Sequence, residues 1–146
     1  MTLPLPELGW SVLNPHWEAA RRGEFRLPRC VSCMAFNWYP KDLCRECGAS
    51  SFDWVLLHGR ASLFTWTVVH RALHTSFAPL LPYISAIVTI DEDPRVRYVT
   101  RLLDARSDAL CIGAPVRMCF EDFGHPAVTT GTIGVFCRLQ YAEDHI

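Results

Sequence analysis

Four cysteines stand in two matched pairs, which is the arrangement in this sequence best suited to chemistry. Cys30 and Cys33 form one Cys-x-x-Cys pair, Cys44 and Cys47 form the second, and ten residues separate the two pairs. Each pair can turn two thiolates in one direction, so two facing pairs supply the four sulfur ligands that tetrahedral Zn²⁺ prefers. Because four thiolates leave no open position for water or substrate, the pattern indicates a structural ion.

Two disulfides, a redox-active pair or an iron site would also use such cysteines. A redox-active Cys-x-x-Cys motif needs only one pair beside a helix, whereas this chain has two pairs. Gly48 directly follows the second pair, and Pro28 and Pro40 each lie shortly ahead of one pair. Glycine and proline at these places favour two metal-binding turns. We therefore predict a structural Zn²⁺ ion held by all four cysteines.

The cellular setting is predicted from the other cysteines and from hydropathy. Cys111, Cys119 and Cys137 lie among apolar neighbours and are predicted to fill the core. An odd total of seven cysteines suits a reducing compartment. The first residues carry neither the basic stretch nor the apolar run of a signal peptide, and no apolar stretch approaches the length of a membrane span. We expect a cytoplasmic protein with no membrane partner.

The charge balance argues against a general nucleic-acid binder. Fourteen Lys and Arg residues face fifteen Asp and Glu residues, which gives a net charge of −1, whereas such binders usually show a basic excess. Phe64 and Trp66, with nearby arginines, could still stack on and contact a single strand, so a single-stranded nucleic-acid-binding module is the alternative function. No recognisable nucleophile and base pair accompanies the histidines His58, His70, His74 and His125. Catalysis by this chain alone is therefore not predicted.

The elements that must position the cysteines follow from the residue pattern. A short helix is expected over residues 16–22, with Asn14 as the N-cap, Pro15 at the first helical position and Gly23 after the end. Aromatic residues around the two Cys-x-x-Cys turns, here called the knuckles, would cover a small zinc-binding segment that has little core of its own. From residue 51 onward, β-branched and aromatic runs predict strands over 52–56, 62–69, 83–90, 95–103, 115–120 and 129–139, with a helical turn within 104–110.

Together these elements predict a mainly β protein. An N-terminal helix and a zinc ribbon would be followed by a five- to six-stranded antiparallel OB-type barrel. The predicted boundaries are 1–24 for the N-terminal arm and helix, 25–50 for the zinc ribbon and 51–146 for the OB-fold domain.

Several segments resemble the family catalogued as domain of unknown function 35 (DUF35). The resemblance begins with residues 16–30 and the two knuckles. It includes the aromatic spacer, which is the segment between the knuckles that ends at 38–40. It continues, in the same order as in the family, through residues 65–71, 82–88 and 112–118. In that family a helix precedes a rubredoxin-like zinc ribbon, and an OB fold follows.

The resemblance implies a non-catalytic accessory subunit. Members of the family assemble with enzymes of acyl-CoA metabolism, above all thiolase-like ones that act as thiolases, acyltransferases or retro-aldol lyases. A hot-dog-fold enoyl-CoA hydratase is the alternative partner. The catalytic residues would then belong to the partner in a hetero-oligomer, expected to be a heterotetramer, and this chain would stabilise the partner and help to bind the shared acyl-CoA.

That role assigns two further sets of residues. Arg71, Arg95 and Arg97 are the candidates to contact the CoA phosphates through charge-assisted hydrogen bonds. The segment 73–82 is more apolar than a free loop should be, which suggests burial against a partner. The expected interface residues are His74, Phe77, Leu80, Leu81 and Tyr83.

Overall fold

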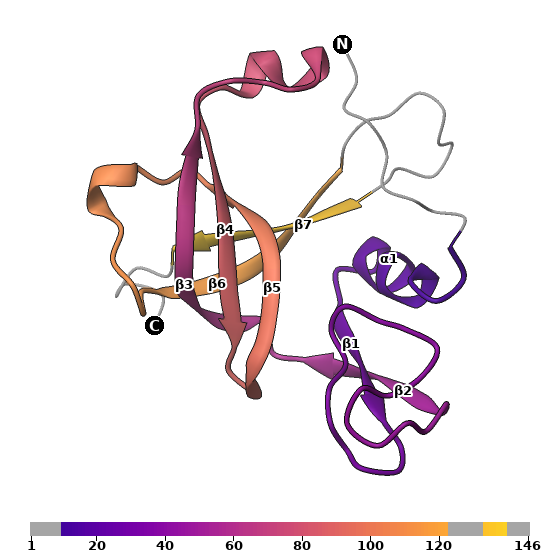
Figure 1. Cartoon of the computed structure of the whole chain (residues 1–146). Coiled ribbons are helices and arrows are strands. Elements are labelled where there is room, and N and C mark those ends of the chain that lie inside the picture. The colour runs from indigo at the N-terminus through magenta and orange to yellow at the C-terminus, as the bar shows by residue number, and fades with distance from the viewer. Residues whose placement is uncertain (1–9, 123–132, 140–146) are drawn as a thin grey trace.

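The computed structural model describes residues 10–122 and 133–139. The segment that carries the cysteine pairs belongs to a small N-terminal layer, formed by the first helix and the first two strands, which lies beside a larger barrel (Figure 1). Helix α1 (Asn14–Arg21) has Pro15 in its first turn, and Leu13 rather than Asn14 occupies the N-cap position. Arg22 is the C-cap residue of the helix, and Gly23 follows with a φ of 71°. The predicted helix is therefore present, with its start one residue away from the expected position.

Two strands form the sheet of this layer. Strand β1 (Phe25–Cys30) pairs antiparallel with β2 (Phe52–Leu57), with Phe25 opposite Leu57 and Cys30 opposite Phe52. The long segment between the strands carries both knuckles. Strand β2 therefore pairs within the N-terminal sheet and has no place in the barrel order.

The larger part is a closed five-stranded barrel. Its strands are β3 (Arg60–Val69), β4 (Tyr83–Ile90), β5 (Asp93–Leu103), β6 (Pro115–Asp122) and β7 (Ile133–Leu139), in the order β3-β4-β5-β7-β6. The pairings are antiparallel except for the short parallel contact of β5 with β7 at Leu102 and Leu103. In β4, alternate residues from Ile84 to Ile90 are buried, as a strand with one face in the core requires. The predicted OB-type barrel is thus confirmed.

Two short 3-10 helices lie in the connections between barrel strands. The β3–β4 connection contains η1 (Thr75–Leu80) and projects from one end of the barrel (Figure 1). The expected helical turn within 104–110 is η2 (Ser107–Ala109). Residues 129–132, the predicted start of the last strand, lie outside the described residues. No helix in the described part of the chain has the length and apolar character needed to cross a membrane.

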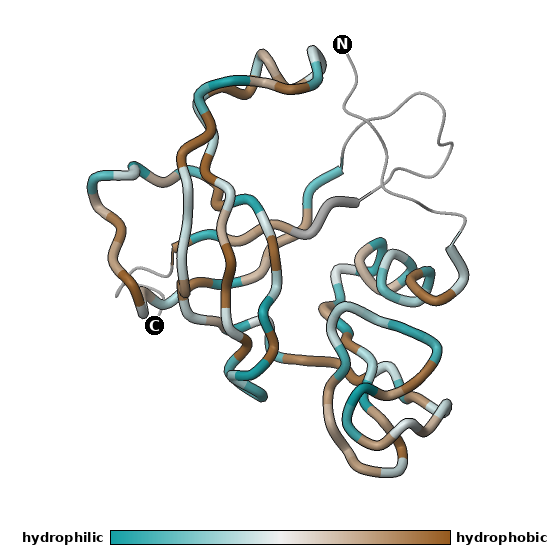
Figure 2. Tube along the Cα trace, in the orientation of Figure 1, coloured by the Kyte–Doolittle hydropathy of each residue, from teal (hydrophilic) through white to brown (hydrophobic). Residues whose placement is uncertain are grey.

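One hydrophobic cluster runs through both parts of the molecule. It includes Phe25 and Leu27 of β1 together with Val88 and Val96 of the barrel, and apolar residues recur along the barrel strands (Figure 2). Cys137 is fully buried, as predicted. The core prediction is wrong for Cys111, which is exposed because it lies in the connection between η2 and β6, and Cys119 is only partly buried.

Candidate metal centre and its surroundings

The four predicted ligands converge on one point. Their sulfur atoms all lie within 4.8 Å of one another, and the Sγ–Sγ distances are 3.6 Å for Cys30 and Cys47 and 3.6 Å for Cys33 and Cys44. Tetrahedral Zn–S bonds of about 2.3 Å place ligand sulfurs about 3.8 Å apart, whereas disulfide sulfurs are about 2.05 Å apart. None of the seven cysteines is in a disulfide. The spacing therefore fits four ligands of one metal ion.

The two metal-binding turns have the same backbone design. The N–H of Met34 donates to the carbonyl of Cys30 at 2.9 Å, and the N–H of Gly48 donates to the carbonyl of Cys44 at 2.8 Å. Met34 and Gly48 both adopt left-handed φ angles, of 63° and 76°. Glycine was expected after the second pair for this reason. The equivalent role of Met34 was not predicted, because methionine is not a residue that favours this conformation.

The surroundings lower the pKa of two of the four thiols, Cys30 and Cys44, and raise the pKa of the other two. Burial raises the pKa of Cys44. Hydrogen bonds from N–H groups of its own turn and from the Asn37 amide lower it by more, so the pKa is about 6. A hydrogen bond from the N–H of Cys33 lowers the pKa of Cys30. A backbone N–H lowers the pKa of Cys33, but burial and the adjacent sulfurs together raise it by more, to about 12. Four thiolates repel one another in this space unless a cation balances them.

Asn37 connects the two turns. Its buried side chain donates through Nδ2 to Cys44 Sγ at 3.3 Å and to the carbonyl of Ala35 at 3.0 Å, and its Oδ1 accepts from the N–H of Arg45 at 3.0 Å. Sequence reasoning missed this residue, although a lone amide inside the aromatic spacer was a usable signal. The ligand set and its donors fit structural Zn²⁺, which fixes the fold of the ribbon.

His16 joins three elements at the boundary between ribbon and barrel. It is buried, with Nδ1 3.1 Å from the carbonyl oxygen of Arg26 in β1 and Nε2 2.8 Å from the hydroxyl of Tyr98 in β5. Because a carbonyl oxygen can only accept, Nδ1 carries the proton and Nε2 accepts from Tyr98. Burial lowers the pKa of His16 to about 4, so the ring is neutral at pH 7.

Aromatic rings fill the rest of this boundary. Trp38 stacks on Tyr98 with ring centroids 4.9 Å apart, and Phe25 meets Tyr98 edge-on at 5.2 Å. The aromatic spacer therefore also packs against the barrel, besides covering the knuckles as expected.

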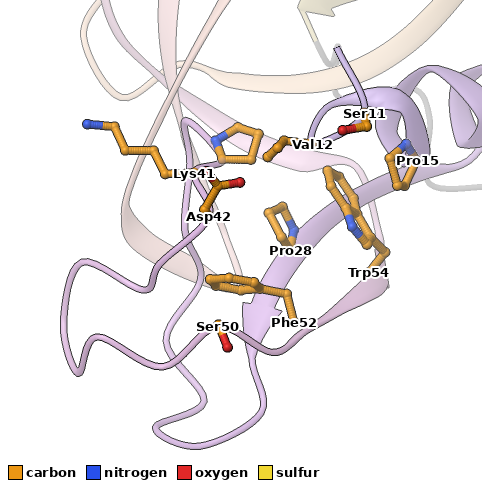
Figure 3. Close-up of a pocket in the computed structure, with 10 residues that line it drawn as sticks. Ser11, Val12, Pro15, Pro28, Lys41, Asp42, Ser50, Phe52 and Trp54 are labelled. Carbon is orange, nitrogen blue, oxygen red and sulfur yellow. The ribbon is translucent and has the colours of Figure 1, made fainter. Parts of the chain in front are cut away.

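A hollow of about 270 Å³ lies between the start of α1 and the ribbon. Figure 3 shows Pro28 between the rings of Phe52 and Trp54, with Lys41 and Asp42 on one side. Prolines and aromatic residues make up half of the ten lining residues, and the other half includes Lys41, Asp42 and two serines. The hollow is therefore mixed in character, with apolar rings that cover part of the small ribbon beside charged and hydroxyl groups.

The three arginines expected at CoA do not converge. The guanidinium of Arg95 donates two hydrogen bonds to Asp93, at 3.0 and 2.9 Å. Arg97 places its guanidinium carbon 3.6 Å from the centroid of the Phe64 ring. Arg71 follows the end of β3 in the β3–β4 connection, whereas Arg95 and Arg97 lie near the start of β5. Since β3 and β5 both pair antiparallel with β4, these two places are at opposite ends of the sheet.

The expected interface residues gather at the projecting β3–β4 connection. Leu73 is fully exposed, and His74 accepts a hydrogen bond at Nδ1 from the N–H of Ser76 at 3.2 Å. The rings of Phe77 and Tyr83 lie 6.1 Å apart across the connection. Leu80 and Leu81 are partly buried, and Leu80 and Tyr83 border a hollow of about 290 Å³. The structure thus places these residues together at one end of the barrel.

Comparison with known proteins decides the family. A family model for the rubredoxin-like zinc ribbon domain of ChsH2 matches residues 17–53, and one for the C-terminal OB-fold domain of ChsH2 matches residues 54–121. A solved structure described as an Ltp2-ChsH2(DUF35) aldolase is 25% identical, has a TM-score of 0.78, and the match covers 92% of this chain and 98% of that chain. The chain belongs to the DUF35 family.

Two further relatives agree with this assignment. A DUF35 domain-containing scaffold protein of Methanocaldococcus jannaschii is 27% identical over 108 residues, which cover 70% of our DUF35 chain and 74% of the relative. A DUF35 protein of unknown function from Sulfolobus solfataricus shares the fold with a TM-score of 0.57 at 9% identity, and the match covers 89% of our chain and 86% of that one.

Proposed function

We propose that this DUF35 protein is a non-catalytic accessory subunit of a thiolase-like complex that processes an acyl-CoA. The observation that carries the proposal is the nearly end-to-end match to a chain of the Ltp2-ChsH2(DUF35) aldolase. The scaffold designation of the archaeal relative supports the same role. The partner would be a thiolase, an acyltransferase or a retro-aldol lyase, and the aldolase match favours the lyase. A heterotetramer is the expected assembly, and an enoyl-CoA hydratase is the alternative partner.

The partner would bind at the β3–β4 connection. Leu73 is fully exposed there, and it is followed by Phe77, Leu80 and Leu81 within the same short segment. Apolar surface of this kind is stabilised when another protein removes it from water. Burial against the partner would account for the composition of a segment that projects from the barrel.

Arg71 is the arginine best placed to contact a CoA ester in such a complex. It lies two residues before Leu73, so one surface could meet both the partner and the phosphates bound there. Arg95 is already paired with Asp93, which leaves it less able to bind a phosphate. Arg97 lies at the far end of the sheet from the proposed interface.

The test is affinity purification of the tagged chain from its native host, with the retained proteins identified by mass spectrometry. We expect stoichiometric recovery of a thiolase-like or hydratase-like subunit. Leu73→Asp should lose that subunit, because a carboxylate cannot be buried unpaired in an apolar interface. Ile112→Asp is the matched control, since Ile112 is also exposed but lies between η2 and β6. Recovery of the chain alone, or with nucleic acid, would contradict the proposal.

A further inference from the structure

A second hollow lies where α1, the aromatic spacer and β5 meet. Its volume is about 330 Å³. The lining consists of apolar and aromatic side chains with a single cation, and its members are Leu13, His16, Trp17, Trp38, Tyr39, Arg97, Tyr98 and Val99. The helix, the ribbon and the barrel each contribute part of the wall, so the hollow exists only in the assembled fold.

The rim of this hollow carries apolar surface that the fold leaves in water. Val99 is 67% exposed and Tyr39 is 55% exposed. Val99 also borders a neighbouring hollow of about 310 Å³ on the outer face of the barrel, which Trp66 and Ile87 line as well. An apolar body longer than the first hollow could therefore continue over Val99 along the sheet.

Arg97 gives the hollow a charge preference. Its guanidinium packs over the Phe64 ring, and within the described residues no carboxylate lies within ion-pair distance of it. Arg95, on the same strand face two residues away, is compensated by Asp93. An uncompensated guanidinium held on an aromatic ring favours a carboxylate or a phosphate, which it binds through paired N–H donors.

The ring of Trp17 contributes apolar surface to the hollow, whereas its indole nitrogen lies behind that surface. Its indole Nε1 is buried and has no hydrogen-bond partner among the described residues. The wall thus combines apolar rings with the guanidinium of Arg97, which has no carboxylate partner among residues 10–122 and 133–139.

We propose that this hollow binds an amphipathic anion, with its apolar body between the aromatic rings and its carboxylate or phosphate head on Arg97. The site belongs to this chain alone and lies at the end of the barrel opposite the proposed partner surface. It therefore does not depend on the accessory role. A carboxylate and a phosphate offer Arg97 the same hydrogen-bond chemistry, and the test separates them.

The test titrates the full-length, zinc-loaded chain with octanoate, octyl phosphate and neutral 1-octanol, by calorimetry and by tryptophan fluorescence. Trp17 and Trp38 line the hollow, so their emission should change on binding. We expect at least one of the two anions to bind about tenfold more tightly than the alcohol, as one charge-assisted contact provides. The tighter anion identifies the preferred head group.

Matched variants keep the test specific. Arg97→Gln should weaken anion binding about tenfold and leave octanol binding unchanged, whereas Arg95→Gln should change neither by more than about twofold. Val99→Glu should weaken anion binding more than Val99→Gln, because the added carboxylate repels the head group. Anions that bind no more tightly than octanol, or equal effects of Arg97→Gln and Arg95→Gln, would overturn the proposal.

Discussion

At the scale of single residues, His16 and Asn37 are buried polar side chains that each hydrogen-bond to more than one segment of the chain. His16 connects α1 to β1 and to a barrel residue 82 positions later, and Asn37 connects one metal-binding turn to the other. Buried polar groups are favourable only when their hydrogen bonds are made, so each of these residues requires one arrangement of its neighbours.

His16 should make the stability of the protein depend on pH. Its pKa falls from 6.5 in the unfolded chain to about 4 in the fold, because burial disfavours the imidazolium. Between these values the unfolded state binds more protons, so stability decreases as the pH falls below about 6.5, by about 2 kcal/mol at pH 5. Urea unfolding at pH 7 and pH 5 measures this loss. His16→Gln should lack that part of the pH dependence, and an unchanged dependence would contradict the assignment.

Asn37 should contribute to metal affinity without being a ligand. Asn37→Ala removes the N–H donor to Cys44 and the link to the second turn, and loss of such a supporting hydrogen bond typically costs 10–100-fold in affinity. Competition with a chromogenic zinc chelator measures the change. Asn14→Ala, in α1, is the control and should retain the wild-type affinity. Equal affinities for the two variants would show that Asn37 has no such role.

At the scale of elements, the two metal-binding turns are nearly equivalent in backbone but differ in sequence. Each closes with an N–H that bonds to the carbonyl of the first cysteine, and each needs a left-handed residue at that point. Glycine occupies the position in the second turn, and exposed Met34 occupies it in the first. A residue with a Cβ atom is disfavoured by about 1–2 kcal/mol in this conformation.

Substitutions in the two turns should therefore have different effects on stability. Gly48→Ala should destabilise the zinc-loaded protein by about 1 kcal/mol, since the new Cβ atom is strained at a φ of 76°. Met34→Gly should not destabilise it, because the relieved strain offsets the greater freedom of glycine in the unfolded chain. Thermal unfolding of both variants measures the difference. Equal loss of stability in both would contradict the equivalence of the turns.

At the scale of the whole molecule, the zinc ribbon and the barrel share one hydrophobic core. Phe25 and Leu27 of the ribbon belong to the same buried cluster as barrel residues, and Trp38 stacks on Tyr98. A ribbon of this size depends on its metal to fold. Loss of the metal should therefore also destabilise the barrel, because the unfolded ribbon no longer contributes to the shared core and the aromatic boundary.

Cys44→Ser should abolish stoichiometric metal binding and lower the stability of the entire chain. Removal of one thiolate breaks the closed ligand set, and the boundary around Tyr98 then loses its support from the ribbon. Metal analysis and thermal unfolding, followed by both circular dichroism and tryptophan fluorescence, should show the two losses together. Cys111→Ser is the matched control, because Cys111 is exposed and remote in sequence from the four ligands. Normal metal content in Cys44→Ser would contradict the ligand assignment.

The sequence by itself determined the metal ligands, the short helix and the strands of an OB-type barrel. These features depend on spacing, turn residues and the two-residue period of strands, which are local properties of the chain. The N-terminal helix began within one residue of its expected cap, and the four sulfurs converged as the two pairs predicted.

Only the tertiary structure decided which distant residues meet. Four findings depend on how the strands are ordered and how the barrel closes. They are the contact of His16 with β5, the pairing of β2 with β1, the separation of Arg71 from Arg97 and the exposure of Cys111. Strand order is fixed by contacts between segments far apart in sequence, and the residue pattern of one strand does not specify which other strand will pair with it. For the same reason the hollow beside Arg97, with walls from three elements, could be recognised only in the folded molecule.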